Sequence, residues 1–185
     1  IAIVIQARNN STRLKGKILK KILNKTIIEY QIERLKKCKK VDKIIIATTL
    51  SESEKNLIKL CKKINIPVFR GSTNDLLDRH YQLAKKYNLD YVVRIPGDNP
   101  LPDAKEIDKI IDYHIKSNNA FSSNLSNVLN NGYPDGIGAE VYSFWAIKNK
   151  WKTVRSIVRR EHIHLCFLNK KLSKAINNKK FQIGT

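Results

Sequence analysis

The amino end of the chain places a buried strand directly before a cationic loop. Residues 1 to 5 are all apolar and three of them are Ile, a run typical of a parallel strand that is buried on both faces. The next twelve residues include four cations and two hydroxyl side chains: Arg8, Ser11, Thr12, Arg13, Lys15 and Lys17. Ligands of open α/β sheets bind outside the carboxyl ends of strands. We therefore expect a phosphate-binding loop, with a solvated lysine-rich connector as the alternative.

The rest of the sequence alternates between short apolar runs and amphipathic segments. Two buried strands joined by a helix form a right-handed βαβ unit, and 185 residues suit one domain with its own core. We expect an α/β fold: a doubly wound, mostly parallel sheet with helices on both faces. The expected strands are 44–48, 66–69, 91–95, a short strand near Phe121, and one within 133–142; the expected helices are 26–37, 51–63, 75–87, 103–117, 143–152 and 153–168.

A carboxylate follows the strand expected at 91–95. Asp98 stands between Gly97 and a later Pro, in a segment that fixes it at a strand end. Magnesium binds few protein carboxylates and takes its other ligands from substrate phosphates and water. Beside a cationic loop, Asp98 is therefore a candidate magnesium ligand; the alternative is an Asx-turn residue that binds no metal.

Arginine also follows the strand expected at 66–69. Arg70 and Gly71 come directly after that strand, so they point to the same side of the sheet as Arg8. The segment is therefore expected at the same edge as the cationic loop, and a simple turn is the alternative.

The formal net charge of +20 raises nucleic acid as a partner. However, 27 of the 36 cations are Lys, and the sequence has neither an Arg-rich run nor an interleaved aromatic platform. Nucleic acid is therefore not expected to be the partner. The three cysteines are far apart and indicate reduced thiols. No apolar run approaches the length of about 18 residues that a membrane helix needs, so we expect a cytoplasmic protein.

Four blocks carry more specific motifs: Gln6-Ala7-Arg8-x-x-Ser11-Thr12-Arg13-Leu14-x-Gly16-Lys17, Phe69-Arg70-Gly71-Ser72-x-x-Asp75-x-Leu77-x-Arg79, Gly97-Asp98-x-Pro100 and Arg160-Glu161-His162. In this order they resemble the cytidylyltransferases of the spore-coat polysaccharide synthesis type, which are relatives of the CMP-KDO and CMP-sialic acid synthetases. The family usually has Pro in place of Lys15, and Cys or Ser in place of Asn99.

The resemblance implies a nucleotide-diphospho-sugar transferase fold and a homodimer. It also implies a reaction in which CTP and an acidic sugar give a CMP-sugar and pyrophosphate, with magnesium, for surface polysaccharide or glycan synthesis. The implied catalytic residues are Arg8, Arg13, Lys17 and Asp98, with Asp98 also the metal ligand. The implied nucleotide-binding residues are Ala7, Arg8, Ser11, Arg13, Lys17, Arg70, Gly71 and Arg94. The implied sugar contacts are Asp135, Gly136, Glu140, Arg160, Glu161 and His162; for Asp135 a plain turn residue is the alternative.

The sequence departs from the family at its carboxyl end. Members usually continue through a strand with an Asp-Thr-x-x-Asp stretch, whose first Asp is the second metal ligand, whereas residues 163–185 contain no Asp or Glu. We therefore expect a single nucleotidyltransferase domain, over 1–185, that lacks this strand and motif. Asp135 or Glu161 could replace the missing ligand; otherwise the chain is a truncated nucleotide-binding homologue without turnover. A glycosyltransferase of the same fold would need an Asp-x-Asp motif, which is absent.

Overall fold

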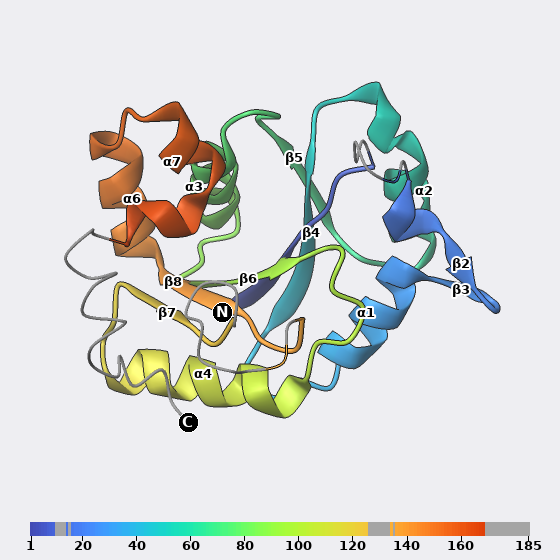
Figure 1. The fold of residues 1–185 in the computed structure, drawn as a ribbon, viewed down its shortest axis with the longest axis horizontal. Helices are drawn as coiled ribbons and strands as arrows, with labels where there is room; N and C mark the ends of the chain where they lie inside the picture. Colours follow the sequence, from blue (N-terminus) through green and yellow to red (C-terminus); the bar gives the residue numbers. More distant parts are fainter. Residues whose placement is uncertain (10–13, 15, 126–133, 135, 169–185) are drawn as a thin grey trace.

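A computed structural model describes residues 1–9, 14, 16–125, 134 and 136–168. Within them, six strands pair in the order β5-β4-β1-β6-β8-β7 (Figure 1). Strands β1, β4, β5 and β6 are parallel, β8 is antiparallel to β6, and β7 is antiparallel to β8. The bounds are β1 Ala2–Gln6, β4 Lys43–Thr49, β5 Val68–Gly71, β6 Tyr91–Pro96, β7 Phe121–Ser123 and β8 Glu140–Ser143. The predicted mostly parallel sheet is confirmed.

The register brings the carboxyl ends of the parallel strands to one edge of the sheet. Gln6 at the end of β1 lies opposite Ala47 of β4 and Pro96 of β6, and the last residues of β4 and β5 are also paired. Because β8 runs the other way, its first residue, Glu140, lies opposite Arg94 near this same edge. Residues from five strands can therefore meet at one edge.

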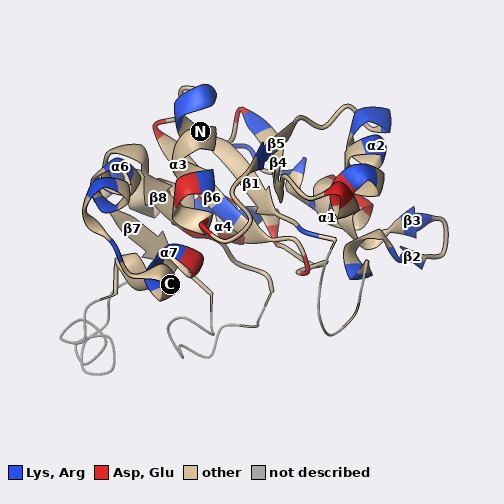
Figure 2. Cartoon of the chain, turned by 90° about the horizontal axis from the view of Figure 1, so that it is seen from above, with Lys and Arg blue, Asp and Glu red and all other residues tan. Residues whose placement is uncertain are grey.

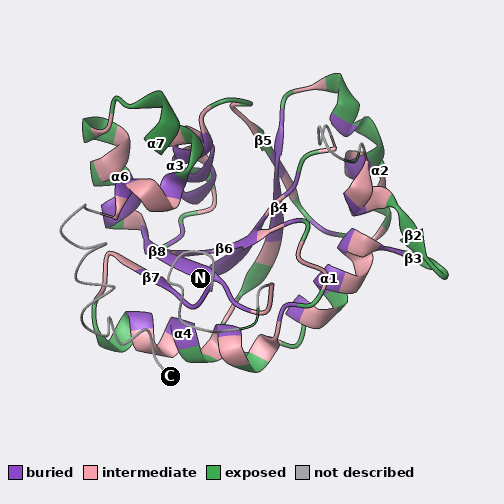
Figure 3. Cartoon of the chain, in the orientation of Figure 1, coloured by how far each residue is buried: buried purple, intermediate pink, exposed green. Residues whose placement is uncertain are grey.

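Helices cover both faces of the sheet (Figure 1). One core packs β1, β4 and β6 against α1, α2 and α4, and the other packs the opposite strand faces against α3, α6 and η3. Figure 3 shows the buried strands between partly exposed helices. The helix bounds are α1 Ile27–Leu35, α2 Lys55–Lys63, α3 Leu76–Lys86, α4 Ala104–Lys116, α6 Phe144–Thr153 and α7 Ile157–Glu161, with 3-10 turns η1 Lys17–Leu19, η2 Glu52–Glu54 and η3 Ile163–Cys166.

Capping residues set the start of the helix that matters most for the site, α1. The Thr26 side chain accepts a hydrogen bond from the Glu29 backbone N–H, and the Glu29 carboxylate accepts one from the Thr26 N–H at 2.7 Å. This capping box satisfies two backbone donors that a helix start leaves open. A short hairpin, β2 Lys21–Ile22 and β3 Lys25–Thr26, precedes α1 and pairs only within itself among the described residues.

Two sequence predictions about elements are wrong. A single helix over 153–168 does not form, because Val154 and Ser156 are extended and His162 leaves the helical conformation, so α7 and η3 are separate. Arg70 and Gly71 do not follow the strand but are its last two residues, since β5 lies two residues later than expected.

Charged residues are spread over the helices and the β2–β3 hairpin (Figure 2). In that view Asp and Glu stand among the Lys and Arg residues. None of the helices that the structure describes combines the length and the apolar character needed to cross a bilayer.

Candidate functional site

The turn after β6 packs directly on the end of β1. The Gly97 N–H donates to the Gln6 carbonyl oxygen at 2.8 Å. A Cβ atom at Gly97 would lie 2.8 Å from that same oxygen and 3.0 Å from the Ala7 Cβ, closer than backbone atoms allow. Glycine is therefore required here for the turn that carries Asp98 to approach the first residue of the cationic loop.

Lys17 and Asp98 form an ion pair across this approach. Lys17 opens the turn η1 directly after Gly16, whose φ of 68° is a left-handed conformation that suits glycine. The side chain of Asp98 is 43% exposed, so it can reach a ligand from the strand edge. The structure thus brings together the predicted phosphate-binding lysine and the predicted metal ligand, which are 81 residues apart in the sequence.

The described start of the cationic loop rests on a residue that the sequence analysis missed, Glu54. Its carboxylate is fully buried and accepts the Asn9 backbone N–H at 3.0 and 3.1 Å and the Thr48 hydroxyl at 2.9 Å. The Asn9 side chain also donates to the Ser53 carbonyl at 3.0 Å. No local motif marks Glu54, because its partners come from other elements.

Among the described residues, a hydrogen bond joins the two ends of the loop, from the Gly16 N–H to the Asn9 carbonyl at 3.0 Å. Arg8 is exposed at its start, which leaves its guanidinium accessible to an anion. The predicted phosphate contacts Ser11 and Arg13 lie outside the described residues.

Arg70 turns back toward the end of β4. Its guanidinium donates to the Leu50 carbonyl at 2.6 Å and to the Thr49 carbonyl at 3.3 Å. Arg70 is still exposed, so it lies at the predicted edge while also holding the turn after β4. A base contact by Arg70 stays a prediction.

Arg79, on α3, holds the segment that follows β5. It is buried and donates to the Ser72 carbonyl at 2.8 and 2.5 Å and to the Thr73 carbonyl at 3.2 Å. A Cβ atom at Gly71 would lie 2.8 Å from the Arg79 Cγ, so the Gly71 position depends on this packing. Burial, with a smaller contribution from nearby Arg8, lowers the pKa of Arg79 to about 10, and the guanidinium stays charged at neutral pH.

Arg94 and Glu140 contact each other across β6 and β8. Arg94 pairs with the buried Glu140 carboxylate and donates to the Gln6 side chain at 2.7 Å. The Tyr142 hydroxyl donates to the same carboxylate at 2.6 Å. A nucleotide contact by Arg94 and a sugar contact by Glu140 stay predictions. Each contact would use a charged group that is already in the ion pair between these two residues.

His164, which the sequence motifs do not mark, lies beside this pair. The His164 Nδ1 atom lies 3.8 Å from Glu140 Oε1. Burial lowers the pKa of His164 below its usual value, so the imidazole is neutral at pH 7. Glu161 and His162 are exposed.

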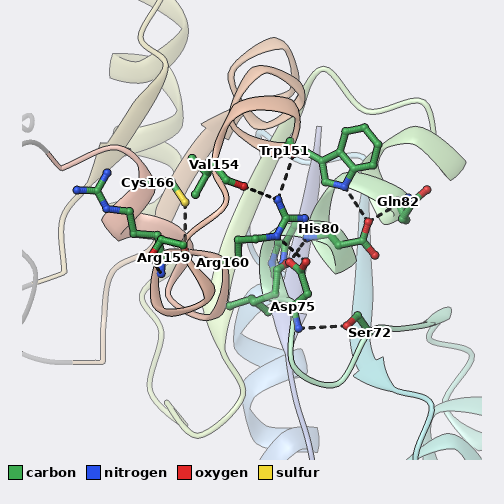
Figure 4. A network of polar contacts seen from close by, with 12 residues as sticks. Ser72, Asp75, His80, Gln82, Trp151, Val154, Arg159, Arg160 and Cys166 are labelled. Carbon is green, nitrogen blue, oxygen red and sulfur yellow. Dashed lines mark hydrogen bonds and ion pairs between the residues drawn. The ribbon is translucent and has the colours of Figure 1, made fainter.

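Arg160 binds the start of α3, as Figure 4 shows. Its guanidinium donates to the Asp75 carboxylate at 2.6 Å and to the Val154 and Trp151 carbonyls at 2.9 and 3.1 Å. Asp75 in turn caps α3 by accepting the Asp78 N–H at 2.8 Å. The structure therefore places Arg160 at the segment that follows the Arg70–Gly71 pair, in a supporting position.

Gly136 lies beside the Asp98 turn. Its φ is 85°, and a Cβ atom there would lie 3.6 Å from the Asn99 Cγ. The predicted acceptor region and the predicted metal turn are therefore neighbours at this point. Asp135 lies outside the described residues.

The described residues supply a limited set of metal donors. Among them, no group of three or more His, Cys, Asp or Glu side chains is placed to hold a metal ion. Asp98 offers one accessible carboxylate at the strand edge. This donor set fits magnesium that takes its remaining ligands from nucleotide phosphates and water, and it does not fit a site built from protein ligands alone.

Comparison with known proteins gives the relatives of this chain. A family model described as Cytidylyltransferase matches residues 2–157. The chain is 42% identical over 160 residues to the uncharacterized protein MJ1063 of Methanocaldococcus jannaschii, covering 86% of this chain and 63% of that protein. It is 32% identical over 145 residues to the spore coat polysaccharide biosynthesis protein SpsF of Bacillus subtilis, covering 76% and 58%. The chain thus spans about three fifths of the length of these relatives.

Solved structures share the fold. A cytidylyltransferase from Leptospira borgpetersenii is 32% identical, with a TM-score of 0.81 over 96% of this chain and 71% of that one. A CMP:2-keto-3-deoxy-manno-octonic acid synthetase complexed with CTP is 17% identical, with a TM-score of 0.66 over 96% and 86%. The predicted nucleotide-diphospho-sugar transferase fold is confirmed by these likenesses.

Proposed function

We propose, because the chain belongs to the cytidylyltransferase family, that it transfers the cytidylyl group of CTP to a sugar and releases pyrophosphate. The observation that carries this proposal is the ion pair of Lys17 with Asp98 where β1 and β6 end. Lys17 is a cation suited to binding phosphate, and Asp98 is a carboxylate suited to binding a metal ion. They meet at the edge of the sheet where α/β folds bind nucleotides.

In the proposed reaction an acceptor hydroxyl oxygen attacks the α-phosphorus of CTP. The bond to the oxygen that bridges the α- and β-phosphates breaks, pyrophosphate leaves, and the acceptor hydroxyl loses its proton. Arg8 and Lys17 bind the phosphates and stabilise the charge on the leaving group, since catalysis of this kind depends on positioning and charge stabilisation. Arg13 is proposed to act with them.

Asp98 would hold magnesium, with Lys17 moving from Asp98 to the phosphates when the nucleotide binds. Bound magnesium would supply further neutralisation of phosphate charge. The described carboxylates add no grouped ligand set to Asp98, which agrees with a site that depends on the nucleotide for the rest of the coordination shell.

The acceptor is proposed to be an acidic sugar for surface polysaccharide or glycan synthesis. The support is the likeness to a spore coat polysaccharide biosynthesis protein and a turn at Gly136 that lies beside Asn99. A homodimer and a cytoplasmic location belong to the same proposal. A second candidate is nucleotide binding without turnover, because the described residues contain no group of three or more metal-ligating side chains.

The test is calorimetric titration of CTP, UTP, ATP and GTP, with and without magnesium, into the wild type and Asp98→Ala. The matched control is Asp112→Ala, because Asp112 is also a half-exposed carboxylate paired with a lysine, at 39% exposure against 43% for Asp98. We expect CTP-selective binding that magnesium strengthens, with the magnesium effect lost in Asp98→Ala and kept in the control. Equal binding of all four nucleotides, or an Asp98→Ala titration matching the control, would contradict the proposal.

Turnover is measured separately as pyrophosphate release with CTP and a panel of sugar acids. Release with at least one acceptor identifies the chain as a complete catalyst. CTP-selective binding without release for any acceptor would favour nucleotide binding without turnover.

A further inference from the structure

A carboxamide lies on the apolar face of α1, where the pattern of the helix leads one to expect a hydrophobic side chain. Gln31 is fully buried beside Ile28, Ile32 and Leu35 of the same helix. Burying an amide in such a place is unfavourable unless its polar atoms are hydrogen-bonded. The amide nitrogen of Gln31 is hydrogen-bonded, whereas its amide oxygen has no hydrogen-bond partner among the described residues.

The nitrogen end of Gln31 is fully used. Its Nε2 atom donates to the Pro96 carbonyl at 2.7 Å and to the Asn99 carbonyl at 2.6 Å. The Asn99 N–H donates to the same Pro96 carbonyl at 3.2 Å, which closes a four-residue turn. The two central residues of that turn are Gly97 and Asp98, so Gln31 holds the carbonyls on both sides of Asp98.

The oxygen end of Gln31 is not used in the same way. Its Oε1 atom is buried and has no hydrogen-bond partner among the residues that the structure describes. A buried acceptor without a partner destabilises a fold, and an aliphatic side chain would avoid that cost. The two donors therefore account for the presence of an amide at this position.

Other contacts fix the same loop at separate points. The Gly97 N–H binds the Gln6 carbonyl, and Arg34, one helical turn after Gln31, donates to the Pro102 carbonyl at 2.9 Å. Gln31 is the residue of α1 that hydrogen-bonds the turn itself. A shift of this turn moves the Asp98 carboxylate relative to Lys17 and the end of β1.

We infer that Gln31 is a positioning residue, which sets the place of Asp98 and thereby the strength of metal-dependent nucleotide binding. This inference rests on the proposed function, since it assigns Gln31 to the same site. Groups that orient a metal ligand without touching the metal typically change metal affinity by about 10- to 100-fold when removed.

The experiment replaces Gln31 by Met, which keeps a similar shape and removes both donors. Gln82→Met is the matched control, because Gln82 is a helical glutamine of α3 whose amide donates to Asp78. CTP is titrated into each variant without metal and at increasing magnesium, and Mn²⁺ binding to the CTP-loaded protein is measured by electron paramagnetic resonance. For Gln31→Met we expect metal affinity to fall about tenfold, with metal-free CTP affinity unchanged.

A Gln31→Met variant that lowers thermal stability but binds Mn²⁺ and magnesium-CTP as Gln82→Met does would overturn the inference. If Gln31→Met does not fold, Gln31→Glu takes its place: it has the same shape, and its protonated form donates one hydrogen bond instead of two, so metal affinity should again fall. Failure of the proposed function itself would give a different result. Mn²⁺ would then bind the wild type no better than it binds Asp98→Ala.

Discussion

At the scale of single residues, the candidate site depends on buried polar groups that bind backbone atoms of its loops. Glu54 is the clearest case, since its carboxylate takes the Asn9 N–H and the Thr48 hydroxyl without any exposure to water. Hydrogen bonds to a charged acceptor are stronger than those between neutral groups. The place of the loop start therefore follows from a residue 45 positions later in the chain.

We predict that Glu54→Gln lowers the free energy of unfolding by about 1–3 kcal/mol. The substitution removes the charged acceptor and places an amide NH₂ group against the donors that Glu54 binds, such as the Asn9 N–H and the Thr48 hydroxyl. The same variant should weaken CTP binding. Glu52→Gln is the control: Glu52 belongs to the same turn, but it is exposed and forms an ion pair with Lys55. Urea unfolding measures the first effect, and equal midpoints for the two variants would contradict it.

At the scale of elements, α7 supports the start of α3. Arg160 of α7 binds the Asp75 carboxylate that caps α3, and it also binds two carbonyls near the end of α6 (Figure 4). A side chain of the predicted Arg-Glu-His block thus reaches the segment next to Arg70 and Gly71. Its described contacts are to the protein, and its predicted sugar contact stays a prediction.

Arg160→Met should lower the free energy of unfolding by about 2 kcal/mol, since it leaves a partly buried carboxylate and two carbonyls without their donor. Hydrogen exchange should quicken at the first amides of α3, including that of Asp78. Arg159→Met serves as the control because Arg159 is the exposed neighbour on the same helix. Exchange at α3 that is identical in both variants would show that the contact does not hold the helix start.

At the scale of the whole molecule, histidines are buried under helices on both sides of the sheet. His114 belongs to α4, which covers one face, and His80 belongs to α3, which covers the other; both side chains are fully buried. Burial, with a contribution from Arg94, lowers the pKa of His80 to about 3, and burial lowers the pKa of His114 to about 4. Both imidazoles are therefore neutral in the folded protein.

The free energy of unfolding should fall as the pH is lowered from 8 to 5. In this range the unfolded chain takes up protons on His80 and His114 near pH 6.5, while the folded protein does not, so acid favours unfolding by about 2 kcal/mol per histidine at pH 5. Urea unfolding at each pH measures this. His114→Gln should reduce the fall, and His162→Gln, which changes an exposed residue, should not. A constant free energy of unfolding across the range would disprove the prediction.

Local sequence patterns predict the fold class and the edge of the sheet where the candidate site lies. Apolar runs and helical periodicity depend on neighbouring residues, so strands such as β1 and helices such as α4 could be predicted locally. Strand order in a parallel sheet then places loops after strands at one edge. For this reason Lys17 and Asp98 could be assigned to one site before their contact was known.

Which side chains hold that site depends on the packing of the whole chain. Gln31 and Glu54 act on backbone groups 45 to 68 residues away, and no local pattern marks such partners. In the structure Arg94 and Glu140, 46 residues apart, pair with each other, and Arg160 pairs with a residue 85 positions away. Their predicted ligand contacts stay predictions. A buried charge is stable only beside its partner, and that pairing exists only after the strands and helices have packed.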